Sequence, residues 1–293
     1  MKSDTMAIAA APSRSADFAA LAKPRLNILV IASALAGYAM AGGDTGHVAR
    51  LLATLVGTAL VAGGASAFNQ LLERVPDGLM RRTRLRPLPD GRLTTQEAGV
   101  FASVMSVSGL AILAGIVNSL SAAIALITLI VYALVYTPLK RRTSFATVIG
   151  AIPGALPPVI GWAAARNELS QGAWVLFGIV FLWQLPHFLA IAWIFREDYA
   201  RAGYAMLPVL EPDGRSTARQ AVGYAAALLP LSLAPTLVGM AGSVYFAGAF
   251  VLSLLFLGLA ARFASTRSIP DARRLFFGSI LYLPLLWILM IGL

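Results

Sequence analysis

Nine runs of roughly 20 mostly apolar residues follow one another along the chain, and they constrain its fold more than any other feature. Hydrocarbon offers backbone amides no hydrogen-bond partners, so a run of this length must satisfy its own amides as a helix. The ~10-residue alternating segments of a membrane β-barrel are absent from the sequence. We therefore expect an all-α polytopic membrane protein with nine transmembrane helices. The runs lie at 26–42, 51–72, 98–117, 120–140, 146–165, 172–195, 221–241, 243–264 and 275–293.

The composition supports this class and excludes several kinds of site. Of the 293 residues, 58% are hydrophobic and 12% are charged, against roughly 25% charged in a soluble domain. The absence of cysteine excludes disulfides, thiol catalysis and cysteine-ligated metals. His47 and His187 are the only histidines, which argues against a dedicated zinc site.

The cations fall almost entirely on one side of the predicted membrane. With nine spans the loops alternate sides, and all 23 lysines and arginines except Arg50 and Arg166 then share the side of the N-terminus. The positive-inside rule places that side in the cytoplasm and Leu293 outside. The net charge of +10 thus reflects topology. It argues against a nucleic-acid partner and favours membrane lipids with anionic headgroups, or an anionic substrate.

We divide the chain into a flexible cytoplasmic N-terminal tail over 1–21 and a single transmembrane domain over 22–293. A short amphipathic stretch, ADFAALAKPR, leads into the first span. A short organellar presequence is the alternative for the N-terminus, because Arg14 and three serines lie there. Asp4 and Asp17 count against that alternative.

The second span ends in three polar residues that share one helical stripe. Asn69, Glu73 and Asp77 are spaced four residues apart, so successive side chains drift by only about 40° around a helix. Oxygen donors arranged in this way suit Mg²⁺, which binds a few carboxylates together with phosphate oxygens and water. Pro76 predicts a kink just before Asp77.

Four arginines follow this stripe closely and complete a candidate polyphosphate site. Guanidinium groups bind phosphate oxygens through paired hydrogen bonds, and the acids beside them could hold a bridging cation. The alternative is a solvated loop whose arginines only fix the topology. The four residues are Arg81, Arg82, Arg84 and Arg86.

The sixth span ends with a second cluster of the same kind on the same side. Arg196, Glu197, Asp198 and Arg201 lie there, and no other span ends in this way. The two clusters could face each other across the bundle and hold a diphosphate through magnesium. The hydrocarbon attached to that diphosphate would lie in the membrane, which points to a polyprenyl diphosphate.

The middle of the chain holds two further candidates. Lys140, Arg141 and Arg142 are either topology residues or additional diphosphate contacts, with function favoured for Lys140. The following span is rich in glycine and proline, which predicts that it forms the wall of a cavity. In the sixth span, Trp183 and His187 share one helical face. His187 is either a histidine hydrogen-bonded within the bundle, or a contact for a flat aromatic acceptor or its iron.

Six ordered motifs resemble those of protohaem IX farnesyltransferases (haem O synthases), a branch of the UbiA-type superfamily of intramembrane prenyltransferases. The resemblance covers about residues 22 to 290 and implies a bundle of nine transmembrane helices around a lateral cavity. It also implies that farnesyl diphosphate, bound with Mg²⁺, transfers its farnesyl group to a vinyl of haem b, with water adding to give haem O. The motifs are AKPRLNILV, NQLLERVPDGLMRRTRLRPLP, YTPLKRRTSFATVIGAIPGALPPVIGW, WQLPHF, REDYARAGYAMLP and ARRLFFGSILYLPLL.

The residue pattern and the resemblance together give expected roles for single residues. The expected catalytic residues are Asn69, Glu73, Asp77, Lys140 and Asp198. The expected metal ligands are Asn69, Glu73, Asp77, Glu197 and Asp198. The diphosphate would be bound by Arg82, Arg86, Lys140, Arg141 and Arg201, and haem by His187 and Trp183. Thr83 continues the first motif.

The sequence departs from the superfamily pattern at two positions. Glu73 stands where relatives usually carry Asp, and Phe195 stands where they often carry Asp. The second departure puts the number of metal ligands from the second cluster in doubt.

Two rival functions are weighed against this one. A UbiA-type enzyme acting on a quinone or chlorin precursor would share the diphosphate motifs. A secondary transporter would place its charges near the bilayer midplane and show paired broken helices, whereas here the acids lie at helix ends. The expected location is the bacterial inner membrane, with the active site at its cytoplasmic face. Haem A synthase or the assembly machinery of a terminal oxidase are further expected partners.

Overall fold

The computed structural model describes residues 13–43 and 48–292, and all regular structure within these ranges is helical. Residues 1–12, 44–47 and 293 lie outside the described residues, and so do Asp4 and His47. Most of the expected N-terminal tail therefore has no structural account.

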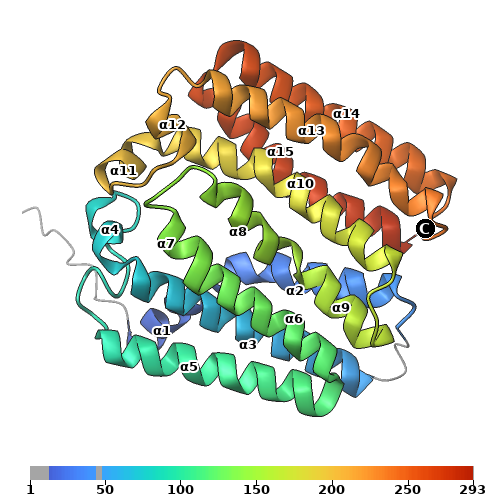
Figure 1. Cartoon of the computed structure of the whole chain (residues 1–293), viewed down its shortest axis with the longest axis horizontal. Helices are drawn as coiled ribbons and strands as arrows, with labels where there is room; N and C mark the ends of the chain where they lie inside the picture. The colour runs from blue at the N-terminus through green and yellow to red at the C-terminus, as the bar shows by residue number, and fades with distance from the viewer. Residues whose placement is uncertain (1–12, 44–47, 293) are drawn as a thin grey trace, which may run out of the picture.

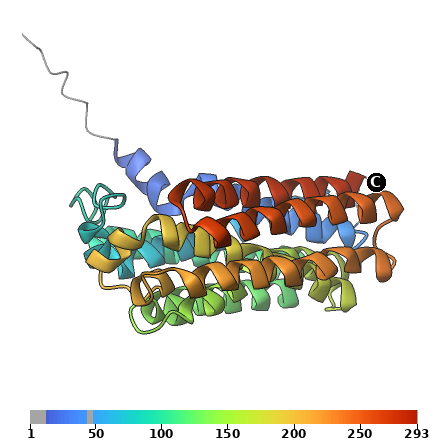
Figure 2. The ribbon, with the colours of Figure 1, turned by 90° about the horizontal axis from the view of Figure 1, so that it is seen from above.

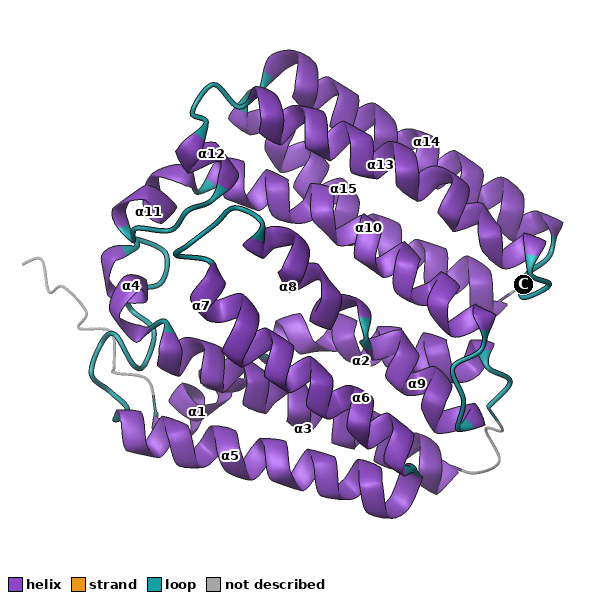
Figure 3. Cartoon of the chain, viewed as in Figure 1, coloured by secondary structure: helices purple, strands orange, loops and turns teal. Residues whose placement is uncertain are grey.

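The long helices lie side by side in one bundle, and the shorter helices α4, α11 and α12 gather at one end of it (Figure 1). We call this the charged end. The loops meet at the two ends of the bundle (Figure 3), and the view from above shows the long helices lying nearly parallel (Figure 2). The helices are α1 (Arg14–Ala22), α2 (Pro24–Met40), α3 (Val48–Leu72), α4 (Arg74–Leu79), α5 (Thr95–Ile112), α6 (Ser119–Ile130), α7 (Thr137–Leu139), α8 (Ala146–Ala155), α9 (Pro157–Arg166), α10 (Gln171–Ile194), α11 (Arg196–Arg201), α12 (Leu207–Leu210), α13 (Arg215–Leu237), α14 (Ser243–Thr266) and α15 (Ile269–Gly292); π-helical turns occupy η1 (Leu113–Val117) and η2 (Val131–Tyr136).

The predicted nine spans equal the larger of the two span counts that the structure allows, eight or nine. Eight helical segments among the described residues are long and apolar enough to cross a membrane. The ninth candidate is the pair α1 and α2, which meet at an angle of 41°. The chain is therefore an all-α, multi-pass membrane protein with eight or nine spans.

Helix α1 begins in the stretch that the sequence analysis assigned to a flexible tail, and it packs onto the bundle. The Ser13 side chain caps it by accepting a hydrogen bond from the amide of Ala16 at 3.3 Å. Leu21 is fully buried, and Asp17 forms an ion pair with Arg92 at 2.9 Å. The amphipathic entry segment is thus part of the folded structure, because its apolar face covers α3 and α5.

The span rich in glycine and proline is broken at Leu156 into α8 and α9, and it packs very closely against α2. A Cβ atom added at Gly37 would lie 1.9 Å from the Pro158 carbonyl oxygen. One added at Gly161 would lie 1.8 Å from the Ala34 carbonyl oxygen. Only glycine permits this backbone contact, which agrees with the role of small residues in membrane helix packing.

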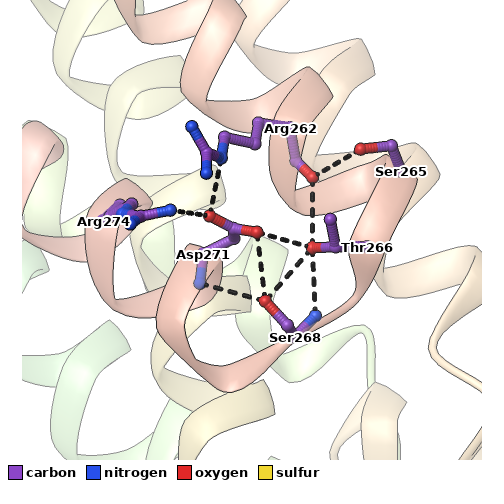
Figure 4. Close-up of polar contacts among 6 residues, drawn as sticks. All are labelled: Arg262, Ser265, Thr266, Ser268, Asp271 and Arg274. Carbon is purple, nitrogen blue, oxygen red and sulfur yellow. Dashed lines mark hydrogen bonds and ion pairs between the residues drawn. The ribbon is translucent and has the colours of Figure 1, made fainter.

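The turn between α14 and α15 is held by one buried acid at the charged end (Figure 4). Asp271 accepts from the Arg262 and Arg274 guanidinium groups at 2.8 and 2.6 Å. It also accepts from the hydroxyls of Thr266 and Ser268, at 2.8 and 3.1 Å. These four contacts close the last helical hairpin.

Candidate active site

Two long helices at the charged end stop in the same way, with a break followed by a six-residue helix. α3 ends at Leu72 and α4 follows, whereas α10 ends at Ile194 and α11 follows. Pro76 has no amide hydrogen for the Leu72 carbonyl, which accounts for the first break. The predicted kink is therefore present, and it falls at Glu73 rather than directly beside Asp77.

The two breaks meet in space. The backbone amide of Arg81 donates to Oδ1 of Asp198 at 3.3 Å, and the Arg82 guanidinium donates to the Tyr199 hydroxyl at 3.1 Å. The same guanidinium lies over the Phe195 ring, 5.1 Å from its centroid. The prediction that the ends of the second and sixth spans converge is thus confirmed.

Two buried carboxylates from the first cluster form ion pairs there. Nζ of Lys140 lies 2.7 Å from Oε1 of Glu73, and a guanidinium nitrogen of Arg86 lies 2.7 Å from Oδ2 of Asp77. Lys140 follows α7 directly, and its ammonium also lies 4.4 Å from the centroid of the Tyr136 ring. Charges in this position are shielded from bulk water, so their interactions are stronger than at an open surface.

The second cluster divides into residues that reach the junction and residues that do not. Asp198 is buried and forms an ion pair with Arg201, one turn along α11. Glu197 is exposed, and Arg141 is also exposed. Neither side chain forms a hydrogen bond or ion pair with another described residue. A six-residue helix can turn only one face inward, which accounts for the separation of Glu197 from Asp198.

Glu73 stays ionised because its cationic neighbour outweighs its burial. Burial alone raises the pKa of Glu73, but the charge and hydrogen bond of Lys140 more than compensate, and the net pKa is lowered. The Tyr204 hydroxyl is buried from solvent and has no hydrogen-bond partner of normal geometry among the described residues. Burial, followed by the charge of Glu73, raises the pKa of Tyr204, so this group remains a proton donor. The sequence analysis did not select Tyr204.

Asn69 links the stripe to the first span through a lysine that the sequence analysis also missed. Nζ of Lys23 donates to Oδ1 of Asn69 at 3.2 Å, and the Asn69 amide donates to the Thr137 hydroxyl at 3.1 Å. Lys23 sits at the bend between α1 and α2 with a φ of 49°. A positive φ in a residue other than glycine is an unusual conformation, and it often marks a functional position.

The donor set fits a divalent cation that is completed by phosphate oxygens. Oδ1 of Asp77 and Oδ2 of Asp198 accept no hydrogen bond and form no ion pair with the described residues. Neither atom is fully buried, so both are accessible to a ligand. No three histidine, aspartate or glutamate side chains in this part of the chain form a metal-binding group by themselves. The residues present therefore suit Mg²⁺ bound by one or two carboxylates, with substrate phosphate and water as its other ligands.

An apolar cavity of about 270 Å³ lies within the bundle and borders the junction at Lys23. Lys23 lines this cavity. It also lines a second, more open pocket, together with Arg86. Pro153, Gly154 and Pro157 line the cavity, which confirms that the broken span forms a cavity wall. The cavity has the composition expected for a hydrocarbon tail, with few polar groups and many aliphatic ones.

His187 and Trp183 also line this cavity. Their rings stack with centroids 5.6 Å apart. The centroid of the Phe276 ring, on α15, lies 5.0 Å from that of His187. Nδ1 of His187 and the Ser279 hydroxyl are 2.7 Å apart. The structure thus places both predicted haem-binding residues on the cavity, with their rings held in an aromatic cluster.

Comparison with known proteins identifies relatives of the whole chain. A model of the UbiA prenyltransferase family matches residues 30–283. The "Protoheme IX farnesyltransferase" of Solibacter usitatus (strain Ellin6076) is 48% identical over 284 residues, which cover 94% of this chain and 97% of that protein.

Solved structures share the fold at much lower identity. A structure from work on digeranylgeranylglyceryl phosphate synthase has a TM-score of 0.79 at 17% identity, covering 95% of this chain and 99% of that one. A UbiA homologue from Archaeoglobus fulgidus bound to DMAPP and Mg²⁺ has a TM-score of 0.64 at 17% identity, with 94% and 100% coverage. These similarities establish the fold of the bundle.

Proposed function

Because this chain belongs to the UbiA prenyltransferase family, we propose that it transfers the farnesyl group of farnesyl diphosphate to a vinyl group of haem b. Water then adds, and the products are haem O and diphosphate. Relatives over 40% identical and matching nearly the whole chain carry the name protoheme IX farnesyltransferase, which supports this acceptor.

The observation that carries the proposal is the apolar cavity that borders the charged junction at Lys23, which lines the cavity and donates from its ammonium to Asn69. Asp77 and Asp198 come from helix ends far apart in the sequence, yet both lie at this junction. A substrate that fits such a site is ionic at one end and hydrocarbon at the other. A prenyl diphosphate has this form.

In the proposed site, the basic residues bind the diphosphate and the acids hold its counterion. Arg82, Arg86, Lys140 and Arg201 lie at the junction and would contact phosphate oxygens. Mg²⁺, bound by Asn69, Glu73, Asp77 and Asp198, would supply charge neutralisation of the leaving group. Lys23 and Tyr204 are additional donors facing the same site.

The reaction proceeds without an enzyme nucleophile. The bond between farnesyl C1 and the diphosphate oxygen breaks, and the diphosphate leaves with the bonding pair. The vinyl π electrons form the new carbon–carbon bond, water adds to the resulting cation next to the porphyrin, and one proton is released. The apolar cavity keeps water from the farnesyl cation before the acceptor reacts.

His187 and Trp183 form the proposed contact surface for haem b. Their stacked rings face the same cavity as the hydrocarbon tail, so the acceptor would lie beside the reacting carbon. The charged end is proposed to face the bacterial cytoplasm, with the N-terminus on the same side. Haem A synthase or the assembly machinery of a terminal oxidase would then take up the product.

The proposal is tested by incubating the purified protein with haem b, farnesyl diphosphate and Mg²⁺, then identifying the pigment by mass. We expect haem b plus one farnesyl group and one hydroxyl group. Parallel reactions with a hydroxybenzoate acceptor separate the quinone alternative, and exclusive prenylation of the benzoate would overturn the proposal. Transport of substrate across vesicles without a new pigment would instead favour the transporter.

A further inference from the structure

Ser279 on α15 is bonded to both residues of the proposed haem surface, although no role has been assigned to it. It is fully buried. Its backbone carbonyl accepts a hydrogen bond from the Trp183 indole at 2.8 Å. Its hydroxyl oxygen lies 2.7 Å from Nδ1 of His187. One residue therefore fixes the orientation of two rings on the facing helix.

The hydroxyl of Ser279 also determines which nitrogen of His187 carries a proton. Its oxygen also lies 2.5 Å from the Phe276 carbonyl oxygen, a contact that requires the single hydroxyl hydrogen between the two oxygens. If the hydroxyl donated to Nδ1 instead, the two oxygens of Ser279 and Phe276 would face each other at 2.5 Å with no hydrogen between them. Both contacts are hydrogen bonds only when Nδ1 carries the hydrogen and donates it to the Ser279 oxygen. The neutral imidazole in this tautomer has a free lone pair on Nε2.

Nε2 of His187 is available to a ligand. No hydrogen bond joins it to any residue in the described part of the chain, and the atom is not fully buried. The ring itself cannot turn freely, because it lies between Trp183 and Phe276. A fixed imidazole that donates from Nδ1 to an oxygen and leaves Nε2 bare is the usual arrangement of a metal-binding histidine.

We propose that Ser279 is a positioning residue that holds His187 in the Nδ1–H tautomer, so that Nε2 is the axial ligand of the haem b iron. This inference rests on the proposed function, since it needs haem b as the acceptor. The hydrogen bond from Nδ1 to Ser279 would increase the electron donation of the imidazole to iron. The hydrogen bond from the Trp183 indole to the Ser279 carbonyl would hold the Trp183 ring in place against the porphyrin.

The test uses resonance Raman spectra of ferrous haem b bound to the purified, full-length protein. We expect an iron–histidine stretching band in the wild type and its loss in His187→Ala. In Ser279→Ala the band should persist at a lower frequency, because Nδ1–H has lost its acceptor. The affinity for haem b should fall about 10-fold, whereas the KM for farnesyl diphosphate should not change.

A pair of variants separates the hydroxyl from packing. Thr and Val have nearly the same shape, so Ser279→Thr and Ser279→Val disturb the buried site alike and differ in the hydroxyl. The band should keep the wild-type frequency in the first and be lowered in the second. Ser253→Ala is a control, because Ser253 is also buried but bonds to Tyr282 at 2.9 Å instead. It should leave the spectrum unchanged.

The failures of the two proposals can be told apart. If the wild type neither binds haem b nor converts it, the proposed function is wrong. If the wild type makes haem O but its bound haem shows no iron–histidine band, or if the Thr and Val variants give identical spectra and affinities, the role of Ser279 is wrong.

Discussion

The charged end of the bundle holds two groups of acids and arginines: the turn around Asp271 and the junction that contains Asp77 and Asp198. They differ in how completely their carboxylate oxygens are hydrogen-bonded. Asp271 has two partners on each oxygen, and all of them lie within nine residues in the sequence (Figure 4). Asp77 and Asp198 keep one oxygen each without a described partner. The contact from Arg81 to Asp198 spans 117 residues.

This difference separates a structural acid from a ligand-binding one. A carboxylate whose lone pairs are all used locally can stabilise a turn but cannot bind a cation without losing those bonds. A carboxylate with a free oxygen, held by distant elements, is prepared for a further ligand. Residue types alone would not distinguish the clusters, because both combine buried Asp with Arg.

The largest effect is expected from Asp77→Ala. Loss of this carboxylate removes a proposed metal ligand and the partner of Arg86, so haem O formation should fall by at least about 10²-fold. The helical content and elution volume should match the wild type, and Asp77→Asn serves as the shape-matched control. Turnover close to normal in both variants would contradict the assignment of Asp77.

Lys140→Met should lower the rate less and change its pH dependence. The wild-type pKa of Glu73 is lowered because Lys140 outweighs burial. Without the ammonium, burial remains and raises this pKa, so Glu73 becomes protonated at a higher pH. The acid limb of the rate profile should therefore move to higher pH. An unchanged limb would show that the Glu73–Lys140 pair does not control activity.

Asp271→Asn tests the structural cluster. Arg262 and Arg274 lose the negative charge of their common partner, and the amide nitrogen cannot accept from Thr266 and Ser268, so the hairpin between α14 and α15 should loosen. We expect the Tm to fall by a few degrees while the kcat of the folded protein stays near the wild-type value. A large loss of kcat at unchanged Tm would mean that this cluster, too, belongs to the active site.

The smallest effect is expected from Glu197→Gln. The side chain is exposed and forms no hydrogen bond or ion pair with another described residue, so the rate and the Mg²⁺ dependence should both stay within about twofold. A marked rise in the Mg²⁺ concentration needed for half-maximal rate would restore Glu197 to the proposed ligands.

Hydropathy and helical periodicity predicted the bundle and the stripe of Asn69, Glu73 and Asp77, because both depend on local sequence. They did not predict which face of α11 turns inward, and so Glu197 and Asp198 could not be separated. Lys23 and Tyr204 were missed because their place at the site depends on tertiary packing. Both residues occur in motifs used for the family resemblance, which was the one available signal.

The contact of α2 with α9 limits how this enzyme could evolve. At Gly37 and Gly161 the two backbones touch carbonyl to α-carbon, with no side chain between them that could be shortened. The seam beside the cavity cannot open by trimming a residue. A descendant that used a longer isoprenoid would have to gain its room elsewhere in the lining, where side chains such as Leu29, Val180 or Leu283 can be exchanged for smaller ones.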